Sequence, residues 1–209
     1  MAKQRRDAQA TKARIINEAR ELFSKKGFDA TTIDDIATAS DVNKALIYYY
    51  FKNKSGLYSD VMSGLFDAIY KEVTDAEKIC TSSIDELETF IKTYTRYANQ
   101  HPYFPALLLR ELSDSGAHLP KTMFISMRKV FTLLSEILRK GEREGVFSKS
   151  IPMIVHFMII GSINLMVTTK PLRQKAMEID TEVDTCNECS VDEIATYTFQ
   201  TIKKSLEVK

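Results

Sequence analysis

The sequence predicts an all-α protein in which a small helix-turn-helix head precedes a larger helical body. Seven Gly and five Pro in 209 residues are too few for the frequent turns of a β-sandwich. Apolar residues recur at helical spacing through long stretches without a breaker, and no segment shows convincing strand alternation. We therefore expect about nine helices, of which the first three form a compact basic group.

The first three helices are predicted from local signals. The first covers about 8–26 and ends at Gly27, a residue type that commonly terminates helices. The second covers about 33–39, because a capping hydroxyl precedes it three residues ahead of a carboxylate. After a short turn, Asn43 can cap the third helix, residues 44 to about 51. Two short helices joined by a tight turn are typical of a helix-turn-helix.

Six longer helices are expected in the rest of the chain. Ser55 can cap the first of them, whose apolar residues keep helical period to about Val73. The others are expected at about 84–98, 104–112, 120–141, 151–169 and 191–206. Residues 170–190 are expected to be the one long irregular stretch.

Charge is divided unevenly along the chain. Residues 1–54 carry 11 Lys and Arg against 7 Asp and Glu, whereas the remainder carries 18 against 21. A basic head on an acidic body favours nucleic-acid binding by the head. Chance variation in surface charge also produces a difference of this size.

Neither export nor membrane insertion is predicted. The N-terminus has basic residues but no apolar core after them. The most apolar segment, 151–167, contains Pro152 and polar side chains, and it is shorter than the roughly 20 apolar residues that span a bilayer. Three Cys, an odd number, fit a reducing compartment. We therefore expect a cytoplasmic protein without a membrane partner.

The third helix has the pattern of a DNA recognition helix. Ile47, Tyr50 and Phe51 can pack inward. The residues predicted to point outward are Lys44, Leu46, Tyr48 and Tyr49. Exposed Lys and Tyr can bind phosphate oxygens, and an exposed Leu can contact a thymine methyl group. An ordinary amphipathic helix with a Tyr-rich core face would have much the same composition.

Four stretches near the N-terminus carry a specific pattern: TKARII at 11–16, ELFSKKGF at 21–28, ATTIDDIA at 30–37 and IYYYFKNK at 47–54. In order and spacing they resemble the head of the TetR family of transcriptional repressors. The resemblance implies a homodimeric DNA-binding repressor that a small molecule controls, and not an enzyme. It also implies that Thr32, Asn43, Tyr48, Tyr49 and Lys54 bind phosphates, and that Lys44 and Leu46 face the bases.

Several residues depart from the family's usual pattern. Ala45 replaces a usual Gly, Leu46 a common Thr, and Tyr49 a frequent His. The operator sequence therefore cannot be copied from relatives. Asp34 stands where several members carry a basic, base-reading residue. Because an acid repels phosphate, we expect the second helix to contribute less to readout here.

A ligand cavity is expected in the body, where aromatic and sulfur-containing residues concentrate. Its candidate residues are Phe66, Tyr70, Tyr94, Tyr97, Phe104, Met123, Phe124, Met127, Phe131, His156 and Met158. Met adapts its shape to irregular apolar partners, so the effector is expected to be small and largely apolar. Each of these residues, taken alone, is also typical of an ordinary core.

The resemblance also implies how the chain assembles. The helices at 151–169 and 191–206 would form a four-helix bundle with those of a two-fold mate. The two recognition helices would then enter successive major grooves of a palindromic double-stranded operator. On this interpretation residues 1–54 are the DNA-binding domain, and residues 55–209 bind the effector and dimerise.

Cys186 and Cys189 form one CxxC motif without a second. A structural zinc site needs four ligands, and Cys80 and His118 could complete one only by accident of folding. We therefore expect no metal, no cofactor and incidental thiols in an exposed loop. Two alternatives stay open: thiol or metal control at this motif, and a DNA-binding dimer without a ligand. An enzyme is not expected, because no phosphate loop, nucleophile motif or metal-ligand pattern is present.

Overall fold

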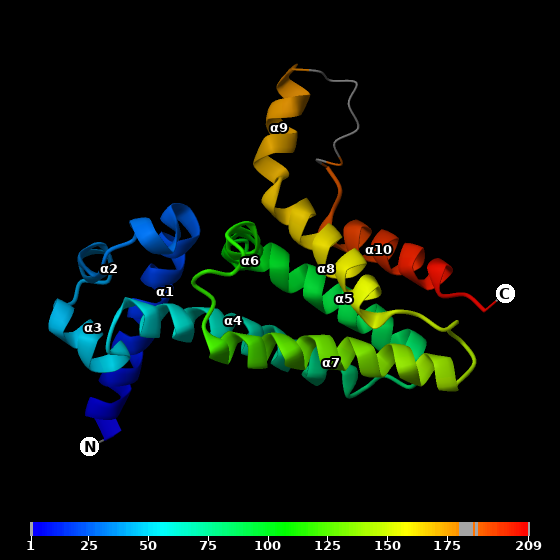
Figure 1. Cartoon of the computed structure of the whole chain (residues 1–209), viewed down its shortest axis with the longest axis horizontal. Helices are drawn as coiled ribbons and strands as arrows, with labels where there is room; N and C mark the ends of the chain where they lie inside the picture. The colour runs from blue at the N-terminus through cyan, green and yellow to red at the C-terminus, as the bar shows by residue number, and fades with distance from the viewer. Residues whose placement is uncertain (1, 180–185, 187, 209) are drawn as a thin grey trace. The chain divides into compact units, whose positions relative to one another are not determined.

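The computed structural model is all-α in the part of the chain that it describes, residues 2–179, 186 and 188–208. These residues form ten helices (Figure 1): α1 Ala2–Ala30, α2 Ile33–Ala39, α3 Lys44–Phe51, α4 Lys54–Glu77, α5 Ser83–Gln100, α6 Tyr103–Ser113, α7 Lys121–Arg143, α8 Pro152–Thr168, α9 Lys170–Ile179 and α10 Val191–Ser205. The predicted fold class is confirmed.

The sequence analysis does not predict α9. This helix occupies the start of the stretch 170–190 that was expected to be irregular; residues 180–185 and 187 of that stretch lie outside the described residues. Pro171 stands at its second position, where proline is tolerated because the first turn lacks intrahelical acceptors for its N–H groups. No residue of α9 is buried. The helix is short and largely polar, so its sequence lacks the long apolar stripe by which the core helices were predicted.

The chain divides into two compact units. The first comprises residues 1–67 and 106–126 and contains the helix-turn-helix. Its core is formed by apolar side chains from α1 to α4, including Ile15, Ala19, Phe23, Ile36, Ala37, Ile47, Phe51, Leu57, Val61 and Met62. This core leaves the remaining faces of α2 and α3 to solvent.

The regular part of α1 ends at Gly27, where the backbone has φ 84 and ψ 174. Glycine adopts this conformation easily because it has no Cβ. A Cβ at this position would also lie 3.0 Å from Nη1 of Arg110. Beyond the break, the buried Thr31 hydroxyl donates to the Gly27 carbonyl at 2.7 Å. The helix stop predicted at Gly27 corresponds to this break.

The second unit comprises residues 68–105 and 127–209. Within it α10 packs against α5 and α8, and α5 packs against α8. The Tyr94 hydroxyl of α5 donates to Oδ1 of Asn164 on α8 at 3.1 Å, and both residues are buried. This bond satisfies two polar groups that would otherwise be costly in an apolar core.

Apolar side chains cover more than one face of α8. Val155, Ile159 and Ile163 are buried, whereas Ile154, Phe157 and other large apolar residues are exposed. No single helix of the described residues is long and apolar enough to cross a membrane. Helices α8 and α9 reach the required length and apolar composition only when they are taken together, and the chain bends by 59° between them.

Candidate nucleic-acid interface

Side-chain caps set the starts of both helices of the helix-turn-helix. The Thr32 hydroxyl accepts from the Asp35 N–H at 3.0 Å, and the Asp35 carboxylate accepts from the Thr32 N–H at 3.2 Å. Hydrogen bonds to the carboxylate from the Thr32 N–H foremost, then from the Thr32 side chain, with the charge of Lys26, hold the pKa of Asp35 below its usual value. Oδ1 of Asn43 accepts from the Ala45 N–H at 2.9 Å. The predicted capping box and the predicted cap of α3 are confirmed.

Helix α3 presents a buried face and an open face. Ile47 and Phe51 are buried, and Tyr50 and Leu46 are partly buried. On the open face lie the exposed side chains of Lys44, Tyr48 and Tyr49. Tyr49 is 79% exposed, which is unusual for a large aromatic ring and leaves it available to a partner.

An ion pair joins the two helices. Nζ of Lys44 lies 2.6 Å from Oδ1 of Asp34. The hydrogen bond to Asp34 raises the pKa of Lys44. The sequence analysis considered these two residues separately, because ten positions of sequence separate them and only the turn between the helices brings them together.

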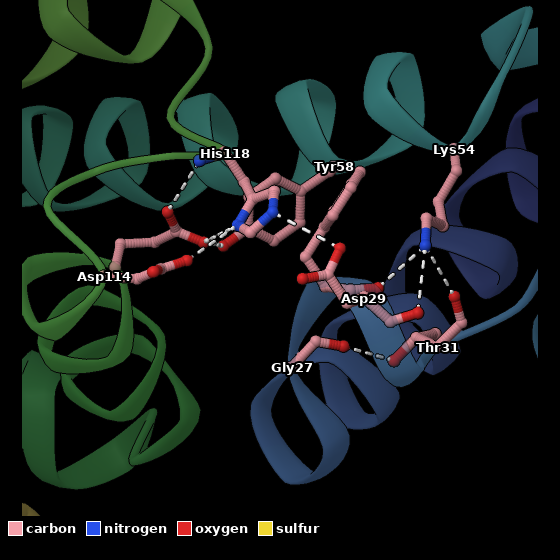
Figure 2. A network of polar contacts seen from close by, with 9 residues as sticks. Gly27, Asp29, Thr31, Lys54, Tyr58, Asp114 and His118 are labelled. Atoms are coloured by element: carbon pink, nitrogen blue, oxygen red, sulfur yellow. Dashed lines mark hydrogen bonds and ion pairs between the residues drawn. The ribbon is translucent and has the colours of Figure 1, made fainter.

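Lys54 binds the end of α1 (Figure 2). Its ammonium group donates to the main-chain carbonyl oxygens of Phe28, Asp29 and Thr31, at 2.9, 3.3 and 3.1 Å. It also lies 4.3 Å from the centre of the Phe28 ring. An ammonium group has three N–H donors, so these carbonyls can occupy all of them. A lysine chosen from sequence as a phosphate ligand therefore has an internal partner in the structure.

A second polar network includes Tyr58 and His118 (Figure 2). Glu111 of α6 is 2% exposed and accepts from the Tyr58 hydroxyl at 2.5 Å and from the His118 N–H at 3.3 Å. The His118 ring stacks on Phe28 with 4.6 Å between ring centres, and its Nε2 lies 3.3 Å from a carboxylate oxygen of Asp29. Sequence reasoning missed this network, since its members are far apart along the chain.

The predicted ligand residues are divided between the units. Phe66, Met123 and Phe124 belong to the first, and Tyr70, Tyr94, Tyr97, Phe104, Met127, Phe131, His156 and Met158 to the second. Phe124 and Met158 are exposed. The ring of His156 meets Phe131 edge to face at 5.4 Å. Burial lowers the pKa of His156 to about 4, and its Nδ1 is buried without a hydrogen-bond partner among the described residues.

The CxxC motif differs from the expectation. Cys186 and Cys189 were expected as separate thiols, but a disulfide joins them, with 5.1 Å between their Cα atoms. The positive φ of 49° at Cys186 turns the chain back toward Cys189. Both border a hollow of about 900 Å³ beside α8 and α10, together with Met166, Tyr197 and other residues. Among the residues described, no group of three His, Cys, Asp or Glu could hold a metal ion.

Family models account for most of the chain. The model of the bacterial regulatory proteins of the tetR family matches residues 15–61, and that of a tetracyclin repressor-like C-terminal domain matches residues 84–194. The chain belongs to the TetR family. The resemblance seen in the sequence is thereby confirmed, and so is its function as a TetR-type transcriptional regulator.

Individual relatives agree with this assignment. The chain is 29% identical over 164 residues to the probable HTH-type transcriptional regulator YttP of Bacillus subtilis, covering 78% of this chain and 79% of YttP. It is 30% identical over 122 residues to the biofilm operon icaADBC negative transcriptional regulator IcaR of Staphylococcus aureus, covering 53% of this chain and 66% of IcaR. The fold matches that of FadR from Bacillus subtilis in complex with stearoyl-CoA, with a TM-score of 0.73 and 19% identity over 93% of this chain and 99% of FadR.

Proposed function

We propose that this TetR-family repressor binds operator DNA through the open face of α3 and that a small, largely apolar effector releases it. Residues 1–54 form the DNA-binding domain of this proposal, and residues 55–209 bind the effector and dimerise. The observation that carries the first half is the exposed Lys44, Tyr48 and Tyr49 face of α3, opposite a buried face.

The exposed residues have chemically distinct tasks. Hydroxyl and amide groups of Thr32, Asn43, Tyr48 and Tyr49 suit phosphate oxygens, which position a protein on DNA without reading its sequence. Lys44 suits a base edge, and the partly buried Leu46 suits a thymine methyl group. Lys54 acts on DNA indirectly in this proposal, by holding the end of α1 against α4.

Phosphate contacts can be tested without knowing the operator. Duplexes that the protein itself selects from a random library provide the probe. Tyr48→Phe removes one hydroxyl and leaves the ring, so affinity should fall by a similar factor for selected and unrelated duplexes. Equal affinities of the variant and the original protein would count against a phosphate contact at Tyr48.

The open face of α8 supports a homodimer. Its large exposed apolar residues are Ile151, Met153, Ile154, Phe157, Met158 and Leu165, and the exposed Tyr197 stands on the neighbouring α10. A contiguous apolar face of this kind commonly marks a protein interface. A second copy of the chain is the partner that this proposal adopts, since family members are expected to dimerise through these helices.

The chemistry around His156 supports an apolar effector. The neutral imidazole of His156 meets Phe131 edge to face, and its buried Nδ1 has no hydrogen-bond partner among the described residues. A few polar groups among apolar side chains are typical of a small-molecule site. FadR, which shares the fold, was solved in complex with stearoyl-CoA. We infer that the effector here combines a large apolar part with few polar groups.

A further inference from the structure

We propose that Asp34 and Lys44 act as a single reader of one G·C base pair, an inference that rests on the DNA-binding function proposed above. The pair joins the two helices near their N-terminal ends, since Asp34 is the second residue of α2 and Lys44 the first of α3. In a helix-turn-helix, the N-terminal residues of the second helix contact base edges. The 2.6 Å contact between Nζ and Oδ1 therefore lies where bases are read.

Stability does not explain this ion pair. The two side chains are 54% and 66% exposed, and water screens such exposed pairs until they contribute little. The two helices already have side-chain caps and share a buried core that includes Ile36 and Ile47. The helix-turn-helix therefore does not need the pair to hold its shape.

The pair borders an open hollow of about 580 Å³ between α2 and α3. The other residues that line it are Ala37, Thr38, Asp41, Val42 and Asn43. Both charged groups are thus accessible from one side of the helix-turn-helix, and the edge of a base pair can approach them together.

Affinity for the DNA backbone does not explain Asp34 either. A carboxylate repels phosphate, and it neutralises the attraction that Lys44 alone would exert. What the pair provides instead is a hydrogen-bond donor and a hydrogen-bond acceptor side by side. In the major groove, guanine offers the acceptors O6 and N7, and its cytosine partner offers the N4 amino donor. Lys44 would donate to guanine while Asp34 accepts from the paired cytosine.

An A·T pair also carries a donor beside an acceptor, but it matches less well. Its two acceptors, N7 of adenine and O4 of thymine, lie on either side of the adenine N6 donor, whereas O6 and N7 of guanine lie next to each other; the thymine C5 methyl group also stands beside O4. The methyl group would displace water from the Lys44 ammonium without replacing its hydrogen bonds. G·C is therefore the favoured pair.

Selection from a random duplex library tests the inference. The original protein should enrich one G·C pair at a fixed place in each half-site. Asp34→Asn keeps the size of the side chain but removes its charge and replaces one of its two acceptor oxygens with an amino donor, so the preference for cytosine at that place should fall about tenfold or more. Lys44→Met should lose the preference for guanine there.

Glu21→Gln is the matched control. Glu21 forms a similarly exposed ion pair in the same unit, 2.9 Å from Nζ of Lys25, but it lies in α1 and does not border the hollow. This variant removes the same charge, so it should shift affinity for all duplexes alike and leave every base preference unchanged. Thermal melting establishes that all three variants are folded.

The outcomes separate this inference from the function on which it rests. If Asp34→Asn behaves like Glu21→Gln, with unchanged base frequencies, the pair is not a reader and the inference fails. If the original protein enriches no sequence at all, the proposed DNA-binding function fails. If Asp34→Asn loses the preference for this G·C pair and the control variant keeps it, the result supports both the inference and the DNA-binding function.

Discussion

At the scale of single residues, Lys54 binds main-chain carbonyls at the end of α1, and we propose that it holds the head together without contacting DNA. Main-chain carbonyls that follow the end of a helix need hydrogen-bond donors, and a cation can supply them. Lys54 meets three such carbonyls, all beyond the break at Gly27, and the face of Phe28. Each kind of contact typically contributes about 0.5–1.5 kcal/mol. The ammonium is therefore a clamp between α4 and the end of α1.

Lys54→Ala should lower the free energy of unfolding by about 1–2 kcal/mol, because the carbonyls lose their donor. Thermal unfolding measures this loss. The dependence of DNA affinity on salt should stay nearly unchanged, because an ammonium group that binds the protein's own carbonyls releases no counterion from DNA. A variant that melts like the original protein, and whose salt slope falls by about one, would place Lys54 on a phosphate instead.

Lys52→Asn provides the comparison for this experiment. Lys52 is exposed at the end of α3, and asparagine tolerates its φ of 67°. If Lys52 lies against the DNA backbone, its loss lowers the salt slope and leaves the melting temperature unchanged. The two lysines thus test opposite roles in the same assay.

Glu77 is a buried carboxyl group at the end of α4. Its Oε1 is buried and has no hydrogen-bond partner among the residues that the structure describes. Burial, with the nearby charges of Glu86 and Glu136, raises the pKa of Glu77 to about 7, and Lys140 opposes this effect. The folded protein therefore binds this proton more tightly than the unfolded chain does.

The pH dependence of stability should follow from Glu77. Its contribution is fully present below about pH 4.5, the usual pKa of a glutamate, and is lost as the pH rises through 7. Glu77→Gln removes the buried charge, so it should exceed the original protein in stability by on the order of 1–2 kcal/mol at pH 8, allowing for screening by water. The difference should vanish below about pH 4.5.

Denaturant unfolding at several pH values measures this difference. Glu72→Gln, an exposed glutamate of the same helix, is the control and should follow the original protein throughout. If the free energy of unfolding changes with pH in the same way for Glu77→Gln and the original protein, ionisation of the Glu77 carboxyl group does not destabilise the fold.

At the scale of elements, α8 carries apolar side chains on more faces than the rest of the chain covers. Its inner face packs in the second unit, where Ile160 is 7% exposed. Ile202 of α10 is likewise 3% exposed. Charges at these two positions would disrupt the protein's own core and cannot report on an interface. Phe157, at 62% exposed, belongs to the open face.

Phe157→Asp should therefore convert the proposed dimer into folded monomers, because a desolvated charge in an apolar interface is costly. Sedimentation measures the mass, and circular dichroism measures the helix content. Ile79→Asp, an exposed apolar position outside α8 and α10, should leave the dimer intact. A stable dimer of Phe157→Asp would exclude this face as the interface.

The elements also show how far sequence reasoning extends. The bounds of α2 and α3 were predictable because their caps are local: Thr32 and Asn43 bind N–H groups two or three residues away. Helix α9 was not, because it is short and largely polar. The Asp34–Lys44 pair and the Tyr58–Glu111 bond were not predictable either. Both depend on which helices meet in space, and nothing in the local pattern records that.

At the scale of the whole molecule, control by an effector requires a ligand that binds one state better than another. A compound with equal affinity for the DNA-bound and released states would shift nothing, however tightly it bound. On the function proposed above, the released state is the one that binds apolar compounds more tightly. The CxxC disulfide offers a different kind of control, in which an oxidant rather than a ligand selects the state.

We expect some members of a set of apolar compounds, which includes stearoyl-CoA, to raise the melting temperature and to release DNA. Free coenzyme A is the polar control. A ligand at 100 times its Kd stabilises the state that it binds by about 2.7 kcal/mol. If no apolar compound in the set does either, a dimer without a ligand becomes the better description.

The double variant Cys186→Ser, Cys189→Ser separates the two kinds of control. Cys186 lies only a few residues before α10 and borders the same hollow as Tyr197, but an apolar effector needs no electron transfer. The double variant should therefore bind DNA and respond to the apolar compounds as the original protein does, in a gel-shift assay under reducing conditions. Oxidant should release DNA from neither protein. If oxidant alone releases DNA from the original protein and not from the variant, the thiol pair is the sensor and the apolar effector is not.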